Sequence, residues 1–338
     1  MTLEGWVLIL GFILLVAAIA RPMGLYMDAV YSGRGTFLSP VMRPFENLLY
    51  RLSGVKPDEE GGWKSYAGGI VIFSLICTLG LFAILRLQAY LPWNPTGMPN
   101  VPSNVAMNTA ISFVTNTNWQ AYGGESTMSH FSQMVGLTVE NFLSAAVGMS
   151  VAVAFARGFA RKGSGAIGNS WVDMSRSVLY VLLPISIVMA ICFIAFGMPQ
   201  TLAGSLHATT LEGHAQDIAV GPVASQIAIK MLGTNGGGFF NANAAHPFEN
   251  TGPFVNFIQM LSIFTIGAGL TITFGRMVGD ERQGWALLAS MGVLFLIGTG
   301  VLYWAEAHAS PAMVHAGISP STPNLEGKET RFGLAASA

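Results

Sequence analysis

Charged residues are scarce in this sequence of 338 residues. Lysine, arginine, aspartate and glutamate together make up 10% of it, hydrophobic residues make up 52%, and the formal net charge is −1. The mean hydropathy is +0.53. Because soluble domains carry about 25% charged residues, this composition excludes an ordinary soluble protein. A chain without a basic excess also gives no reason to expect a nucleic-acid partner.

Cysteine is rare as well, and the motifs of common enzymes are missing. Cys77 and Cys192 each lie inside an apolar run, so we expect packing residues rather than a disulfide or a metal pair. No Cys or His spacing resembles a zinc site, and there is no phosphate-binding Gly-x-x-x-x-Gly-Lys-Ser/Thr motif. We therefore expect no catalytic site, no bound cofactor and no machinery for handling ATP in this chain.

Long apolar runs are what the sequence has in place of charge. Six runs are long enough to cross a bilayer; they lie at about 6–20, 68–87, 131–155, 178–196, 254–274 and 285–304. The predicted fold class is therefore an all-α membrane protein with six transmembrane helices.

The first run favours an anchor over a cleaved signal peptide. Glu4 is the only charged residue before it, and Arg21 follows the run directly. This pattern predicts an uncleaved N-terminal anchor at 1–20. We expect a cytoplasmic loop at 21–66 to follow, with a short interfacial helix near 44–52 that is a candidate docking surface.

A polar glycine run between apolar segments is the most unusual stretch of the chain. Residues 222–232 predict a short helix, and the run 233–241 follows with Gly236, Gly237 and Gly238 in succession. That helix would be about 17 Å long, too short to cross a bilayer. Irregular backbone after a half-length helix is tolerated at membrane depth where it is buried or lines a cavity. Backbone carbonyls presented in this way replace the hydration shell of potassium in ion filters, so we expect half of a cation filter here.

The same arrangement occurs earlier in the chain. A short apolar stretch at 103–114 precedes Thr115-Asn116, which aligns with Thr234-Asn235 at a separation of 119 residues, and Phe131-Ser132-Gln133-Met134 likewise aligns with Phe257-Ile258-Gln259-Met260. Each copy would be a span, a half-helix, a Thr-Asn loop and a return span. Repeats in membrane transporters usually enclose the substrate path, although chance similarity of loop composition is the alternative.

The two loops offer neutral oxygen atoms rather than carboxylates. Several oxygen dipoles favour a bare monovalent cation, whereas a ring of acids would favour divalent ions. The partly negative C-terminal ends of the half-helices also favour a cation. The candidate ligands are Asn116, Thr117, Asn118, Thr234, Asn235, Gly236, Gly237 and Gly238. Gln120, Asn241 and Asn243 could either bind the ion or brace the loops against each other.

Isolated charges near these loops have two or more interpretations each. Glu125 and Glu249 could raise the cation concentration at the mouth or could cap the loops. Glu140 lies inside the third span, where burial of a charged carboxylate has a high free-energy cost. Pairing with a basic residue is the favoured interpretation; the alternatives are that Glu140 lines the ion path or stays protonated in a polar contact. We expect Lys230 to reach the outer surface or a partner acid rather than the filter.

Basic residues outside the spans predict the orientation. Six lie between the first and second spans, four between the third and fourth, and two between the fifth and sixth; the opposite side has four. The positive-inside rule therefore places the N-terminus, both Thr-Asn loops and the C-terminal tail outside the cytoplasm. On or near this outer side we expect the histidines as headgroup-level polar residues: His130, His207, His214, His246, His308 and His315.

At the two Thr-Asn loops the sequence resembles a known family, the potassium-binding A subunits of the bacterial Kdp transporter. The resemblance extends over essentially the whole chain and is most specific at 112–120, 221–226, 230–243, 246–250, 279–284 and 326–333. It implies span–pore-helix–filter loop–span units of the potassium channel and transporter superfamily, in the bacterial inner (plasma) membrane. The filter residues that it carries over are Asn116, Thr117, Asn118, Gln120, Thr234, Asn235, Gly236, Gly237, Gly238 and Asn243.

The resemblance also implies an organisation and partners. Such a protein selects potassium outside and passes it to the catalytic B component of the Kdp complex, a P-type ATPase, and the small C and F components complete that complex. The implied segments are an anchor at 1–20, a cytoplasmic loop at 21–66, pore unit 1 at 67–157 with filter loop 115–120, pore unit 2 at 173–283 with filter loop 234–243, and the first span of an incomplete unit 3 with an external tail at 284–338.

One departure from the family pattern concerns the number of units. The family has four, and this chain ends after two and the first span of a third. We expect a truncated form that alone neither closes a pore nor supports potassium uptake, unless two copies pair. Two other functions fit the loops: a self-sufficient potassium channel or symporter, and a membrane scaffold whose glycines allow tight helix packing.

Overall fold

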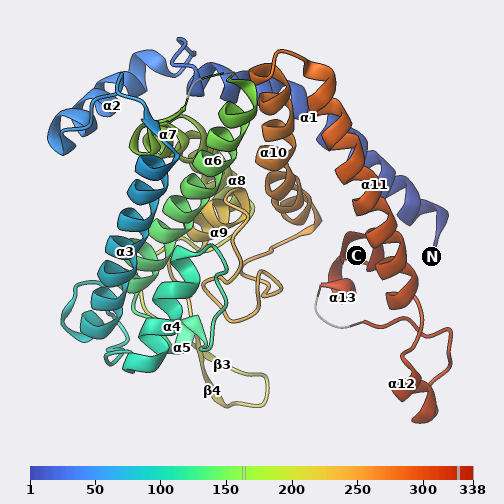
Figure 1. Cartoon of the computed structure of the whole chain (residues 1–338). Helices are drawn as coiled ribbons and strands as arrows, with labels where there is room; N and C mark the ends of the chain where they lie inside the picture. Colours follow the sequence, from blue (N-terminus) through green and yellow to red (C-terminus); the bar gives the residue numbers. More distant parts are fainter. Residues whose placement is uncertain (162, 164, 326–327, 338) are drawn as a thin grey trace. The chain divides into compact units, whose positions relative to one another are not determined.

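The computed structural model of the chain is mostly helical and describes residues 1–161, 163, 165–325 and 328–337 (Figure 1). Lys162, which enters the charge count above, and Glu326 and Gly327, in the last resembling stretch, lie outside the described residues. Six helices in the described part are long and apolar enough to cross a membrane. The predicted fold class, an all-α membrane protein, is confirmed.

The spanning segments follow the predicted runs and extend beyond them. They contain α1 (Leu3–Tyr31), α3 (Trp63–Leu87), α6 (Val139–Ala160), α8 (Leu183–Ala195), α10 (Pro253–Met277) and α11 (Glu281–Glu306). Helix α1 continues past Ala20 and through Pro22, although proline lacks the backbone N–H of one helical hydrogen bond. Membrane helices tolerate this loss, so the helix ends eleven residues later than the sequence predicts.

Two further spans are interrupted by π-helical turns. The turn η2 (Ser132–Thr138) precedes α6, and η3 (Ser177–Leu182) joins α7 (Ser170–Arg176) to α8. Such turns are rare and often lie at functional sites. In η2 the Thr138 hydroxyl donates to the Gln133 carbonyl at 2.7 Å, which supplies a hydrogen bond where the regular helical ladder shifts.

The two half-helices are present where the sequence predicts them. They are α4 (Ser103–Val114) and α9 (Val223–Leu232). Helix α4 packs against α3, α9 packs against α8, and both pack against α6. Each half-helix is therefore held by the span that precedes it in the chain, as expected for repeated units.

Several small elements complete the secondary structure. Helix α2 (Ser39–Ser53) is the predicted interfacial helix, and a hairpin of β3 (Leu206–Thr209) and β4 (Ala215–Ile218) occupies the loop after α8, where no strands were expected. The short strands β1 (Gly61–Gly62) and β2 (Ala166–Gly168) pair antiparallel. The remaining elements are η1 (Gln88–Tyr90), α5 (Gly124–Thr127), α12 (Pro311–His315), α13 (Glu329–Phe332) and α14 (Leu334–Ser337).

The chain divides into two compact units. One comprises residues 1–26 and 264–338 and has a small core of Ala20, Ala268 and Ile272. The other comprises residues 27–263 and contains both half-helices and both Thr-Asn loops. Its main apolar cluster lies between α3 and α4 and includes Leu81, Leu85 and Phe113, each at most 2% exposed. The candidate site therefore lies within a single unit.

A buried ion pair joins three helices of the larger unit. The Arg157 guanidinium at the end of α6 donates to both carboxylate oxygens of Asp173 on α7, at 2.5 and 2.9 Å. The Tyr66 hydroxyl on α3 donates to the same carboxylate at 2.9 Å. Because a buried carboxylate needs several donors to offset its desolvation, this cluster fixes the three helix ends relative to one another.

Candidate ion-binding site at the two Thr-Asn loops

Both Thr-Asn loops, just after their half-helices, contain residues with a positive φ, a backbone conformation that few residue types adopt. In the first loop Asn116 and Asn118 have φ of +62° and +54°, and in the second Thr234 and Gly237 have φ of +54° and +64°. Asparagine tolerates this left-handed region, but for β-branched threonine it costs on the order of 1–3 kcal/mol. Such a conformation persists only where the surroundings impose it, so the direction of the loop carbonyls is set by neighbouring groups.

Amide side chains tie the two loops to each other. The Asn235 Nδ2 in the second loop donates to the Oδ1 atoms of Asn116 and of Asn118 in the first, the latter at 3.3 Å. Asn118 is fully buried and donates in turn to Asn141 Oδ1 at 2.6 Å. The Ser144 hydroxyl donates to Asn116 Oδ1 at 2.9 Å. Because Asn141 and Ser144 belong to α6, this helix holds both loops, and the amide side chains act as braces.

The glycines let the backbones of the two loops approach closely. A Cβ atom on Gly236 would lie 3.1 Å from the Thr117 carbonyl oxygen, and one on Gly237 would lie 2.8 Å from the Asn118 carbonyl oxygen. A Cβ on Gly238 would overlap the Glu249 carboxylate. Carbonyls of the first loop thus face glycines of the second, at positions where a side chain would not fit.

Gln120 also braces the loops, whereas Asn243 lies outside the cluster. The Gln120 Nε2 donates to the Gly238 carbonyl at 3.0 Å and to the Tyr122 hydroxyl at 3.2 Å. Its Oε1 is buried without a hydrogen-bond partner in the described part of the chain. Asn241 and Asn243 are both exposed, and no described side chain links Asn243 to the amide cluster. The side chains of Asn241 and Asn243 thus stand apart from the amide cluster formed by Asn116, Asn118 and Asn235.

Lys230 does not lie where the sequence places it. Its side chain is 2% exposed, and its Nζ donates to the Gly237 carbonyl at 2.6 Å. The expectation that it reaches the outer surface, away from the filter loop, is therefore wrong. A buried ammonium needs an acceptor because its desolvation is costly, and a loop carbonyl close to α9 meets that need. Lys230 thereby directs the Gly237 carbonyl towards α9.

The two carboxylates near the loops differ in role. Glu249 is fully buried and accepts from the backbone N–H groups of Phe240 and Ala244, at 3.1 and 2.9 Å. It therefore caps the second loop, one of the two interpretations that the sequence left open. Glu125 is half-buried and accepts from the Asn241 N–H at 3.2 Å, which links the segment after the first loop to the second.

Two glutamines that the sequence did not single out as site residues support the second loop. The Gln133 Nε2 donates to the Phe239 carbonyl at 3.3 Å, and Gln226 on α9 donates to Gln133 Oε1 at 2.9 Å. The Gln259 Nε2 donates to the Glu249 carbonyl at 2.7 Å. Gln133 and Gln259 are the aligned glutamines of the internal repeat. That alignment was the signal that could have identified both as supports of the loop backbone.

Glu140 and His130 are two further polar residues for which the sequence predicts an environment. Glu140 is buried, its Oε2 has no hydrogen-bond partner among the described residues, and no basic side chain there pairs with it. The favoured pairing with a basic residue is therefore wrong. His130 is buried within the chain, and its Nε2 lies 2.7 Å from the Ala203 carbonyl.

The arrangement suits a monovalent cation better than a divalent metal. In the part of the chain that the structure describes, no group of three His, Cys, Asp or Glu side chains could hold a metal ion. The loops instead present carbonyl oxygens, and the nearest carboxylate, Glu249, is already bonded to backbone N–H groups. Neutral oxygens held in fixed positions are the ligands by which ion filters replace the hydration shell of potassium.

The different environments of Glu249 and Glu125 predict different effects of their substitution on the free energy of unfolding. We expect Glu249→Gln to lower the free energy of unfolding by about 2 kcal/mol, because it removes an oxygen from a buried carboxylate that accepts two backbone bonds. Glu125→Gln is the matched control, with an expected effect within about 0.5 kcal/mol at a half-exposed position. Thermal unfolding of the purified chain in detergent measures both. Equal effects of the two substitutions would contradict the assignment of Glu249 as the loop cap.

Comparisons with known proteins identify the family of the chain. Residues 10–338 match the KdpA family model, described as potassium-transporting ATPase A subunit. Over its whole length the chain is 60% identical to the potassium-transporting ATPase potassium-binding subunit of Granulibacter bethesdensis, 59% to that of Methylorubrum extorquens and 55% to that of Brucella anthropi. It spans 60%, 59% and 59% of those proteins, respectively. The chain belongs to the KdpA family.

Proposed function

We propose that this chain binds potassium at the two Thr-Asn loops and helps to conduct it across the membrane, as the ion-selecting subunit of an ATP-driven uptake complex. The observation that carries the proposal is the close approach of the Thr117 and Asn118 carbonyls to Gly236 and Gly237. The printed names of the relatives, each a potassium-binding subunit, support the choice of ion.

Within the proposed site, backbone and side chains have different roles. The carbonyls of Thr117, Asn118 and Gly236 are the favoured ligands, because the amide groups of Asn118 and Asn235 are engaged in bracing. The remaining proposed members are Asn116, Gln120, Thr234, Asn235, Gly237 and Gly238, and Asn243, which is exposed outside the amide cluster, completes the set. Pre-set carbonyls cost little reorganisation when the ion loses its water, and this favours an ion whose size matches the space between them.

The proposed partners supply the energy. ATP hydrolysis would take place on the catalytic B component of the Kdp complex, a P-type ATPase, and the small C and F components would complete the complex. The chain itself would act as a non-catalytic subunit of that complex, in the bacterial plasma membrane. The name shared by the relatives, which places a potassium-binding subunit in a potassium-transporting ATPase, supports this division of labour.

Replacing a loop glycine tests the proposed site. We expect Gly236→Asp to raise the half-saturating potassium concentration, or to lower the preference for potassium over sodium, by about tenfold (about 1.4 kcal/mol). The reason is that a carboxylate would enter the space beside the Thr117 carbonyl. The measurement is the potassium dependence of ATP hydrolysis by the complex reconstituted with its partner proteins.

A nearby glycine provides the control. A Cβ on Gly252 meets no heavy atom within 4 Å, so Gly252→Asp should leave the potassium dependence unchanged. If Gly236→Asp behaved like Gly252→Asp, the glycines of the second loop would not belong to the ion site.

The proposed orientation has its own test. In a background that lacks Cys77 and Cys192, we expect Ala121→Cys to react with an impermeant thiol reagent from the outer side only. Ser53→Cys at the end of α2 should react from the cytoplasmic side only. Both positions are exposed, and the twelve-to-four distribution of basic residues is the physical reason. The reverse labelling pattern would overturn the orientation.

A further inference from the structure

Helix α2 has its polar and apolar faces reversed relative to a helix of a soluble protein. Its buried residues are the polar Glu46 and Tyr50. Its exposed face carries a stripe with spacings of four, three, one and three residues, which lie on one side of a helix. The stripe consists of Val41, Phe45, Leu48, Leu49 and Leu52, which are 57%, 59%, 54%, 46% and 79% exposed.

The position of α2 explains what covers this stripe. The helix follows the spanning helix α1 and precedes the spanning helix α3, and it lies across the end of the larger unit at which α3 begins (Figure 1). Because α3 is long and apolar enough to span a bilayer, we expect its first residues to lie near a membrane surface. Helices with an apolar face and flanking arginines rest in the interface, with the apolar face in the acyl region.

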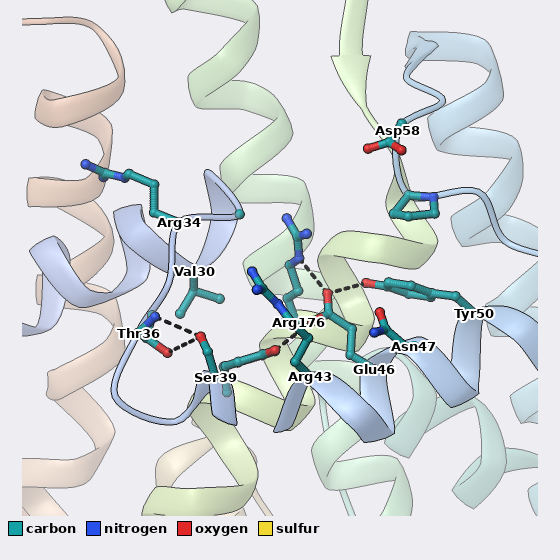
Figure 2. A pocket seen from close by; sticks show the side chains of 13 residues that line it. Val30, Arg34, Thr36, Ser39, Arg43, Glu46, Asn47, Tyr50, Asp58 and Arg176 are labelled. Carbon is teal, nitrogen blue, oxygen red and sulfur yellow. Dashed lines mark hydrogen bonds and ion pairs between the residues drawn. The ribbon is translucent and has the colours of Figure 1, made fainter. Parts of the chain in front are cut away.

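Beneath α2 lies a polar cavity of about 140 Å³, bounded by α2 and by the α7–η3 segment (Figure 2). Glu46 occupies its centre and accepts from Tyr180 Oη at 2.6 Å, Tyr50 Oη at 2.8 Å and Arg176 Nε at 2.9 Å. Burial alone would raise the pKa of this carboxyl, but the bonds from Tyr180, Arg176 and Tyr50 outweigh it and lower the pKa. Glu46 is therefore ionised, and its acceptor capacity is largely used.

Two arginines at the cavity have guanidinium N–H donors that lack an acceptor among the described residues. Arg176 uses only Nε on Glu46; its two terminal nitrogens have no acceptor among the described residues and lie 3.5 Å from where a Cβ on Gly33 would be. Arg43 projects into the same cavity (Figure 2) and has no hydrogen-bond or ion-pair partner among the described residues. Unfilled guanidinium donors that converge in a cavity are the arrangement by which proteins bind phosphate.

The other charges at the cavity do not cancel this excess. Arg34 is paired with Asp28. Asp58 lies on the side of the cavity away from Arg43 (Figure 2) and forms no ion pair with a described residue. A more open hollow of about 600 Å³ continues from the cavity past Arg43 and is also lined by Pro40 and Pro44. The cavity thus opens along the helix that carries the apolar stripe.

We propose that this cavity binds the phosphate group of an anionic phospholipid, whose acyl chains lie against the apolar stripe of α2. A cavity of this volume exceeds several-fold the ~10–15 Å³ that a single water needs on the same measure, and so accommodates a phosphate group. Free inorganic phosphate has the same headgroup chemistry. The apolar stripe beside the cavity favours the lipid, because only a lipid uses both features.

Native mass spectrometry of the purified chain in detergent tests the proposal. Phosphatidylglycerol and phosphatidylcholine with identical acyl chains are the two probes. We expect phosphatidylglycerol to bind on the order of tenfold more tightly, because the arginines repel the cationic choline that phosphatidylcholine carries beside the same phosphate. Arg43→Gln should remove most of that preference, because it removes one of the two positive charges. Arg51→Gln is the matched control: Arg51 is exposed on the same helix and does not line the cavity, so the preference should remain.

Three results would overturn the proposal. These are no preference in the unaltered chain, equal losses in the two variants, or displacement of phosphatidylglycerol by inorganic phosphate at an equal concentration, which would show that the acyl chains add nothing. If Arg43→Gln fails to fold, a photoactivatable phosphatidylglycerol applied to the unaltered chain decides. Cross-links within residues 38–53 support the site, and cross-links confined to other segments contradict it.

Discussion

The hydrogen bonds of Asn235 are the interaction on which the candidate site depends. This one amide joins the second Thr-Asn loop to Asn116 and Asn118 in the first, and α6 holds the first loop through Asn141. These bonds, together with the one from Gln120 to the Gly238 carbonyl, oppose the strain of the left-handed residues in both loops. The direction of the carbonyls, and hence the proposed ion affinity, follows from this network of neutral side chains.

Other residues of the larger unit supply hydrogen-bond partners to the loop backbone, which does not form the regular hydrogen bonds of a helix or sheet. Lys230, Glu249 and Gln133 each bond to backbone of the second loop. In a membrane-spanning protein such backbone cannot turn to water, and each unsatisfied group costs several kcal/mol. Lys230 and Glu249 are therefore engaged with loop backbone, which leaves the carbonyls of Thr117, Asn118 and Gly236 as the proposed ion ligands.

Periodicity and length were sufficient to predict the architecture from sequence. The six spans, the two half-helices and helix α2 depend on local hydrophobic pattern, and this pattern is the strongest signal a single sequence carries. The hairpin after α8 was missed because polar pairing there has no apolar alternation. The continuation of α1 through Pro22 was missed because its packing, not its propensity, decides where it ends.

The residues of the candidate site could be predicted from the sequence, but the contacts between them could not. The Thr-Asn repeat identified both loops, but whether an amide binds an ion or a neighbouring amide depends on distances between segments about 120 residues apart. Lys230 illustrates the limit: a lysine on a short apolar helix predicts exposure, but in the folded chain its buried ammonium donates to the Gly237 carbonyl, a contact that the sequence does not show.

The central claim is that potassium is bound by backbone carbonyls of the two loops, which the amide cluster holds in place. Anomalous diffraction at a wavelength that locates potassium itself tests it most directly, with crystals grown in sodium as the reference. The account predicts a potassium peak within coordination distance of the carbonyl oxygens of Thr117, Asn118 and Gly236. A peak coordinated by the side chains of Glu125 or Glu140, with these carbonyls unoccupied, would contradict it.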